Sequence, residues 1–306
     1  MCIRDRKYVD HAGRKYFSRS AQLVGRIRMA KKVQVTLTGN EGKRLIAKAA
    51  VRMPEIQGRL EKHKILLCGG TTVSALSEEL GLGPLRISGR IDASGARTAL
   101  KKAKTPHNLL VDQGKGQNVD SSIQKVAETL NDKDLVIVGA NAIDPMGRAA
   151  LAFAALGGGS RGYALHSAYM QGVPMLILAG INKLIPDLGA AQAHSGRAGI
   201  DLSMGAAIGL YNIYGPVITE LKAFEILFGV EAVVIAGSGF GTGDGTRTFV
   251  LHGEEAAIQQ AWDLCLGLKG AAVSACEDSL FTCVGGCRHC QRHVGCYYKE
   301  LAQGED

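Results

Sequence analysis

Short apolar runs, each followed by glycine or polar residues, dominate the hydrophobic pattern of the chain. The runs are 64–68 (KILLC), 108–111 (NLLV), 135–138 (LVIV) and 175–179 (MLILA). A continuous apolar run of this length is typical of a parallel strand that is covered on both faces. We therefore expect four buried strands in one sheet.

Helical periodicity lies between these runs. Apolar residues recur at spacings of three, four and seven over 41–60, and Pro54 interrupts this stretch, which predicts an amphipathic helix that breaks or bends there. Further helices are expected over 73–80, 121–130 and 163–170. Strands that alternate with helices predict an α/β fold, with a mainly parallel open sheet and helices on both faces, over 29–199.

The pattern changes toward the C-terminus. It predicts a helix, two strands and a second helix, over 216–228, 232–236, 246–252 and 254–267. This order indicates a small α+β subdomain over 200–270, followed by a Cys-rich tail over 271–306. The two strands are joined by the glycine-rich segment 237–245. A strand follows that segment where a dinucleotide-binding motif needs a helix, so we interpret it as a hairpin tip able to close over a ligand.

The formal charge of +8 is concentrated at the start of the chain. Residues 1–28 contain eight Lys or Arg and two Asp, which leaves 28 basic and 26 acidic residues in the remainder. The near-neutral remainder argues against a nucleic-acid partner. We expect residues 1–28 to be a non-native or untranslated leader, because MCIRDR looks like translated adapter sequence and Met29 offers an ordinary start. The absence of an apolar stretch of about 18 residues predicts no membrane association and a cytoplasmic protein.

Two glycine-containing loops, 69–72 and 157–162, lie at predicted starts of helices. In an open α/β sheet, ligands bind outside the carboxyl ends of the strands, and free amides at a helix start favour an anion there. We therefore predict a site for a small anionic metabolite, with Cys68, Asp112, Asn141 and Lys183 at one edge of the sheet. The predicted ligand-binding residues are Gly69, Gly70, Thr71, Thr72, Asp112, Gly139, Asn141, Gly158, Gly159, Ser160 and Arg161. Either threonine could cap the helix that follows it, and the alternative is that the glycines only form tight turns.

The tail carries the most specific local signal. Four cysteines, Cys283, Cys287, Cys290 and Cys296, lie within fourteen residues. Such density in a cytoplasmic protein indicates a metal site rather than disulfides. Close spacing favours an iron–sulfur cluster over zinc, although a Cys3His zinc site that includes His293 is an alternative, as are reactive or structural thiols.

Two loop sequences resemble a known superfamily. KILLCGGTTVSAL (64–76) is similar to the first phosphate loop of the ribose-5-phosphate isomerase, glucosamine-6-phosphate deaminase and CoA transferase-like superfamily. VGANAIDPMG (138–147) resembles the acidic loop of its methylthioribose-1-phosphate isomerase and initiation-factor-2B-like branch. The likeness covers about residues 41–185, and concerns loops rather than long identity. The C-terminal half matches no member with a known activity, which indicates an uncharacterised family.

The resemblance implies a Rossmann-like domain and catalytic candidates. Cys68 falls where that branch has its catalytic Cys, whereas Asn141 stands where it has its catalytic Asp. An amide cannot act as a general base, so Asp144 is the candidate substitute, and Lys183 would neutralise developing charge. The chain would then bind a phosphorylated or CoA-like metabolite, with isomerase-type or transferase-type chemistry. The alternatives are a non-catalytic metabolite-sensing module and an iron–sulfur redox protein. A homo-oligomeric state is also compatible with the sequence.

Overall fold

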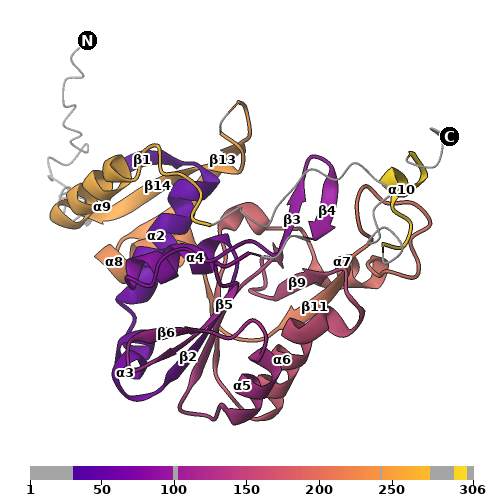
Figure 1. Ribbon diagram of the computed structural model, residues 1–306. Coiled ribbons are helices and arrows are strands. Elements are labelled where there is room, and N and C mark those ends of the chain that lie inside the picture. The colour runs from indigo at the N-terminus through magenta and orange to yellow at the C-terminus, as the bar shows by residue number, and fades with distance from the viewer. Residues whose placement is uncertain (1–29, 99–102, 242, 276–292, 302–306) are drawn as a thin grey trace, which may run out of the picture.

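The protein has a mixed α/β fold in a computed structural model that describes residues 30–98, 103–241, 243–275 and 293–301. A six-stranded sheet forms its centre (Figure 1). In sheet order the strands are β12 (Val217–Ile218), β10 (Met175–Leu178), β7 (Leu135–Gly139), β2 (Lys64–Cys68), β5 (Asn108–Asp112) and β6 (Lys115–Asn118). The first four are parallel, which confirms a mostly parallel sheet, whereas β5 and β6 run antiparallel to their neighbours.

The apolar runs fill this sheet. Every residue of β10 is buried, and so are the four apolar residues of β7 and of β2. Two groups of helices cover the sheet on opposite sides (Figure 1). One group is α2 (Gly39–Val51), α3 (Pro54–Lys62), α4 (Thr71–Glu79) and α8 (Glu220–Phe228), and the other is α5 (Ile123–Thr129) and α6 (Gly159–Met170).

Local signals set the ends of the first helices. Thr38 caps α2 because its side chain accepts a hydrogen bond from the Glu41 amide, while Glu41 bonds the Thr38 amide in return. The predicted break at Pro54 is confirmed, since α2 ends at Val51 and Pro54 opens α3.

A second sheet joins the first described strand to two strands from late in the chain. Its order is β1 (Ala30–Leu37), β14 (Thr246–Glu254) and β13 (Glu231–Ser238), and α9 (Glu255–Gly267) packs against it. Strand pairing therefore crosses the boundary predicted at residue 199, because β1 pairs with β14 and β12 pairs with β10.

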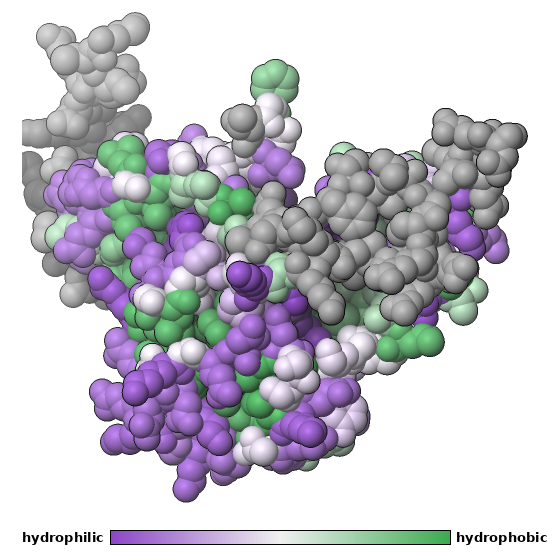
Figure 2. Space-filling view, viewed as in Figure 1, coloured by the Kyte–Doolittle hydropathy of each residue, from purple (hydrophilic) through white to green (hydrophobic). Residues whose placement is uncertain are grey.

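The remaining elements form small additions at the carboxyl side of the main sheet (Figure 1). They are β3 (Gly89–Asp92), β4 (Gly95–Thr98), β8 (Ala142–Ile143), β9 (Ala149–Phe153), η1 (Leu156–Gly158), η2 (Ile181–Lys183), α7 (Leu188–His194), β11 (Gly209–Ile213) and α10 (Tyr297–Leu301). On the face shown in Figure 2, hydrophobic residues lie in separate patches between hydrophilic ones. None of the described helices is long and apolar enough to cross a membrane. The predicted leader lies outside the described residues.

Candidate functional site

Three of the four edge residues lie where the sequence predicts. Cys68 ends β2, and its neighbour β7 ends beside it at Gly139. The next parallel strand, β10, leads through Gly180 into η2, which contains Lys183. The carboxyl ends of β2, β7 and β10 therefore share one edge of the sheet.

The prediction for Asp112 is wrong. Strand β5 is antiparallel to β2, so that Lys64 pairs with Asp112 and Cys68 pairs with Asn108. Asp112 is exposed at the opposite edge, and Asn108 takes the place predicted for it. The chain enters β5 beside Cys68 and leaves it beside Lys64, where a tight turn with positive φ at Gln113 and Gly114 leads into β6.

Arg161, in the first turn of α6, reaches the start of β5. Its Nη2 donates a 3.1 Å hydrogen bond to Asn108 Oδ1 and also contacts His107 Nε2. His107 Nδ1 lies 2.8 Å from the carbonyl oxygen of Arg86, which can only accept. Nδ1 therefore carries the proton and Nε2 accepts from Arg161, so the imidazole is neutral. Burial and the Arg161 charge hold the pKa of His107 well below its usual value.

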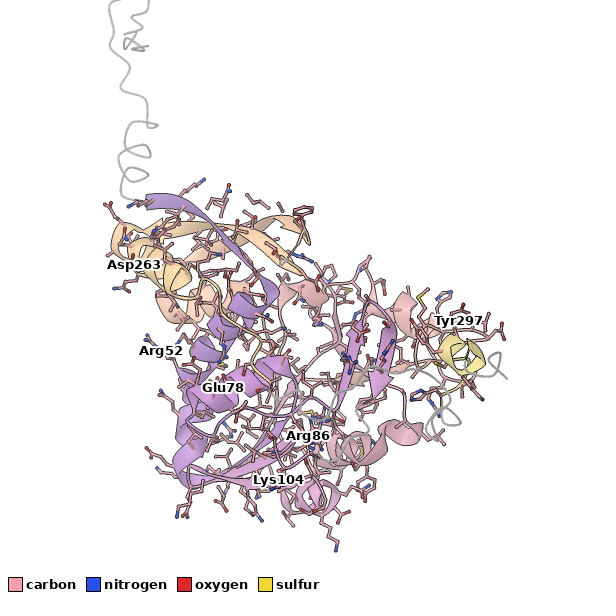
Figure 3. All side chains as sticks on the ribbon, turned by 45° about the horizontal axis from the view of Figure 1, so that its top comes forward. Arg52, Glu78, Arg86, Lys104, Asp263 and Tyr297 are labelled. Carbon is pink, nitrogen blue, oxygen red and sulfur yellow. The ribbon has the colours of Figure 1, made fainter. Side chains whose placement is uncertain are left out.

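The nearby carboxylate of Asp120 forms its hydrogen bonds and its ion pair with residues other than Arg161. Asp120 accepts hydrogen bonds from the backbone amides of His107 and Asn108 and from the Asn108 side chain. It also forms a 3.0 Å ion pair with Arg86, which lies near the centre of the view in Figure 3. Within the described part of the chain, the hydrogen-bond partners of Arg161 are thus both neutral. Burial lowers the pKa of the guanidinium from its ordinary value.

The end of β2 packs tightly against the start of β5. A Cβ atom at Gly69 would lie 2.0 Å from the carbonyl oxygen of His107, so only glycine fits there. Cys68 is fully buried, and burial raises the pKa of its thiol to about 11 despite the nearby charge of Arg161. We call Cys68, Gly69, His107, Asn108 and Arg161 the Arg161 cluster.

The helix starts predicted to bind an anion have no side-chain cap. Gly70 is the N-cap of α4, and Thr71 and Thr72 lie inside its first turn, so the prediction that a threonine caps this helix is wrong. A Cβ atom at Gly70 would meet no atom within 4 Å, which means that the space beside it is open. In α6, the left-handed Gly158 is the N-cap, and the two residues that follow it, Gly159 and Ser160, are exposed.

Asp144 has a bonding pattern that does not fit the predicted general base. Its carboxylate accepts from the backbone amides of Met146, Arg148 and Leu188, and it pairs with the Arg148 guanidinium. The hydrogen bond from Arg148 is the main reason why the pKa of Asp144 is lowered. A buried, fully bonded carboxylate of this kind holds the loop onto the start of α7.

The interactions of Asn141 and Lys183 are with residues outside the Arg161 cluster. Asn141 Oδ1 accepts a 3.0 Å hydrogen bond from the Ala152 amide, which supports the β8–β9 hairpin. Lys183 is coupled electrostatically to Asp244 and to Lys43, a residue of α2 that the sequence analysis missed. The sequence analysis also missed His107, Asn108 and Asp120 as site residues. The adjacent polar residues His107 and Asn108, which directly precede the buried run 109–111, could have indicated them.

Most of the predicted metal site cannot be placed. Cys283, Cys287 and Cys290 lie outside the described residues. Cys296 is described and buried, in a segment held by hydrogen bonds between Ser203 and the backbone of Gly295 and Tyr297. Among the residues that the structure describes, no three His, Cys, Asp or Glu side chains are grouped so that they could hold a metal ion.

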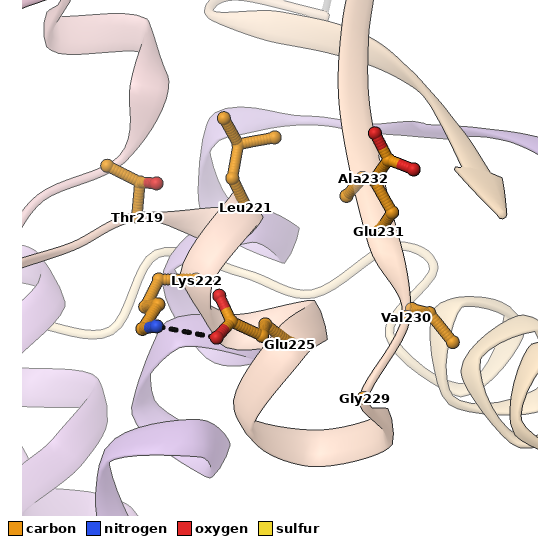
Figure 4. Close-up of a pocket in the computed structure, with 8 residues that line it drawn as sticks. All are labelled: Thr219, Leu221, Lys222, Glu225, Gly229, Val230, Glu231 and Ala232. Carbon is orange, nitrogen blue, oxygen red and sulfur yellow. Dashed lines mark hydrogen bonds and ion pairs between the residues drawn. The ribbon is translucent and has the colours of Figure 1, made fainter. Parts of the chain in front are cut away.

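A groove of about 480 Å³ lies between α8 and β13 (Figure 4). Lys222 and Glu225 form a 2.7 Å ion pair on its wall, and Thr219 and Glu231 also line it. It contains no residue of the Arg161 cluster and no histidine or cysteine. We therefore assign it no chemistry.

Comparison with models of protein families gave no match, and comparison with curated proteins gave none either.

Proposed function

We propose that the protein binds a small anionic metabolite, phosphorylated or CoA-like, with its charged end at Arg161. The observation that carries this proposal is the guanidinium group, which is partly buried and, among the described residues, hydrogen-bonded only to the neutral His107 and Asn108. The charge of Asp120 interacts with Arg161, but this carboxylate forms its ion pair with Arg86. A buried charge without a directly bonded counter-charge is costly, and an anionic ligand would supply one. Arginine is well suited to this role because its planar fork of donors matches phosphate and carboxylate oxygens.

Two further features support an anion at this edge. The amides at the start of α4 have no side-chain cap and lie beside the open space at Gly70. The amides at the start of α6 also lack a side-chain cap, and Arg161 belongs to that turn. Each favourable contact with a helix start contributes about 0.3–1 kcal/mol when exposed. The resemblance of 64–76 to a phosphate loop favours a phosphorylated ligand.

The geometry favours binding without chemistry, as in a metabolite sensor. Cys68 is a neutral, buried thiol, and the oxygens of Asp144 are already bonded. His107 uses both ring nitrogens in contacts with the protein. Proton transfer by Asp144 or Cys68 therefore has no geometric support here, and incubation with ribose 5-phosphate in D2O tests the point. Deuterium bound to carbon in the recovered sugar would contradict the sensing proposal.

Arg161→Met tests the binding site itself. A hydrogen bond to a charged group contributes about 1.5–3 kcal/mol, so we expect affinity for inorganic phosphate, ribose 5-phosphate or CoA to fall at least about tenfold in calorimetry. Arg52→Met is the matched control, because Arg52 is exposed at the rim of the molecule (Figure 3). Equal affinity of the Arg161 variant and the parent for all three compounds would overturn the proposal, and so would a parent that binds none of them.

For the tail, we propose that Cys283, Cys287, Cys290 and Cys296 hold an iron–sulfur cluster, on the basis of their spacing. Protein purified without oxygen should absorb broadly near about 400 nm and bleach with dithionite. Stoichiometric zinc without iron would instead support the zinc alternative.

A further inference from the structure

A second group of charged residues lies beyond the end of β10, on the side of α2 and α8. It consists of Lys43 of α2, Asn182 and Lys183 of η2, Glu220 of α8 and Asp244 of the β13–β14 loop, and we call it the lysine cluster. Lys43 interacts electrostatically with Lys183, Glu220 and Asp244. The four segments meet here although they are far apart in the sequence.

Glycines permit the close packing of this cluster. A Cβ atom at Gly42 would lie 2.3 Å from Glu220 Oε1, and one at Gly180 would lie 2.6 Å from Asn182 Oδ1. Gly245, with positive φ, lies against the Asn182 side chain. The backbones of α2, η2 and the β13–β14 loop can therefore approach one another closely around these polar groups.

The two lysines have no ion pair. Lys43 Nζ donates to the neutral Asn40 Oδ1 at 3.2 Å, and no carboxylate of the described residues lies within 4.0 Å of either amine. Glu220 is buried and accepts a 2.7 Å hydrogen bond from the Ile181 amide. Burial raises the pKa of Glu220, and the charges of Arg247 and Lys43 oppose that shift.

The environment of both amines disfavours their positive charge. Burial, and then the charge of Lys183, lower the pKa of Lys43 to about 8. Burial also lowers the pKa of Lys183, and Asp244 opposes that shift. In addition, Asn182 Oδ1 is buried without a hydrogen-bond partner. The polar groups of the cluster thus do not satisfy one another.

We propose that the lysine cluster is a second anion site, in which Lys43 and Lys183 bind a phosphate group. Two adjacent ammonium groups match the charge of a phosphate dianion, and lysine binds phosphate as a point charge. The unpartnered Asn182 oxygen would accept a hydrogen bond from a hydroxyl group of the same ligand, so a hydroxylated phosphate ester fits better than bare phosphate. This site goes beyond the proposed function, because it lies at the end of β10 and does not use Arg161.

Site-resolved amine labelling tests the proposal. The full chain is treated with a limiting amount of acetic anhydride at pH 7, with and without inorganic phosphate or ribose 5-phosphate, and each lysine is quantified by mass spectrometry. A nearby anion raises the pKa of a lysine by about one or more, so labelling of Lys43 should fall about tenfold with ligand. Lys48 is the matched control, since it lies one turn further along α2 and already pairs with Glu79.

The same experiment on Arg161→Met separates the two proposals. Protection of Lys43 and Lys183 that persists in this variant supports a separate site, even if binding at the Arg161 cluster fails. Protection that disappears in this variant overturns the separate site, and so does a parent in which neither compound protects Lys43 relative to Lys48. When Lys43→Met and Lys183→Met are added to Arg161→Met, they should abolish the phosphate-dependent rise in Tm that Arg161→Met alone retains.

Discussion

Arg161 Nη2 donates a hydrogen bond to Asn108 Oδ1 across 3.1 Å, and so joins the first turn of α6 to the first residue of β5. The two residues are 53 positions apart in the sequence. Because β5 is antiparallel to β2, Asn108 stands beside Cys68 at the carboxyl edge of the sheet. This contact places a cation at the carboxyl edge of the sheet, where we propose that an anion binds.

The glycine pair after β2 provides a matched test of the packing at this edge. Gly69→Ala places a methyl group against the His107 carbonyl and should lower the free energy of unfolding by about 1–3 kcal/mol or more. Gly70→Ala enters open space with an extended backbone and should stay within about 1 kcal/mol of the parent. Urea denaturation measures both, and equal stability of the two variants would contradict the tight contact.

Asp144→Asn distinguishes a structural carboxylate from a catalytic one. We expect a lower Tm at pH 7, because the variant loses the ion pair with Arg148. The folded-state pKa of Asp144 is lowered, so its contribution is complete above the unfolded value of about 3.9 and disappears as the pH falls through the folded value. The deficit should therefore shrink below about pH 4. Asp132→Asn, at an exposed site, is the control, and an unchanged Tm would show that the network does not stabilise the fold.

The Cys68 thiol should be unreactive in the folded protein. With a pKa of about 11, almost none of it is thiolate at pH 8, and burial also blocks access. We expect alkylation by iodoacetamide to be at least about a hundredfold slower than in urea, as followed by mass spectrometry of the peptide that contains Cys68. Rapid alkylation of the native protein would reinstate Cys68 as a candidate nucleophile.

His107 should make stability depend on pH. Its folded-state pKa is lowered, so the unfolded chain takes up a proton below about pH 6.5 that the folded protein excludes. Stability should therefore fall as the pH decreases from about 6.5, by up to about 1.4 kcal/mol per pH unit. In urea denaturation at several pH values, His107→Gln should weaken this dependence, whereas His194→Gln, on the exposed end of α7, should not. An unchanged slope in His107→Gln would mean that His107 is not held neutral.

The sequence by itself determined the four buried strands of the central sheet and the helices beside it, but not the edge strands β6 and β12. The apolar runs of β2, β7 and β10 predict buried parallel strands because a strand covered on both faces needs no polar positions. Pro54 marks the break between α2 and α3 because it cannot donate the hydrogen bond of a helix interior. The edge that contains Cys68, Gly139 and Arg161 follows from the same pattern.

Only the tertiary structure decided the direction of β5 and the partners of the charged residues. The run NLLV fits a parallel or an antiparallel strand equally well, and the structure starts it beside Cys68, so that it runs antiparallel to β2. That choice removes Asp112 from the edge and brings His107 and Asn108 to Arg161. Likewise, the charges of Lys43 and Lys183 interact only because α2 and η2 come together in the fold, and the hydrogen-bond partners of Asp144 come both from its own loop and from α7. Hydrophobic periodicity records which side of an element is buried, but it contains no information on which polar groups meet across elements.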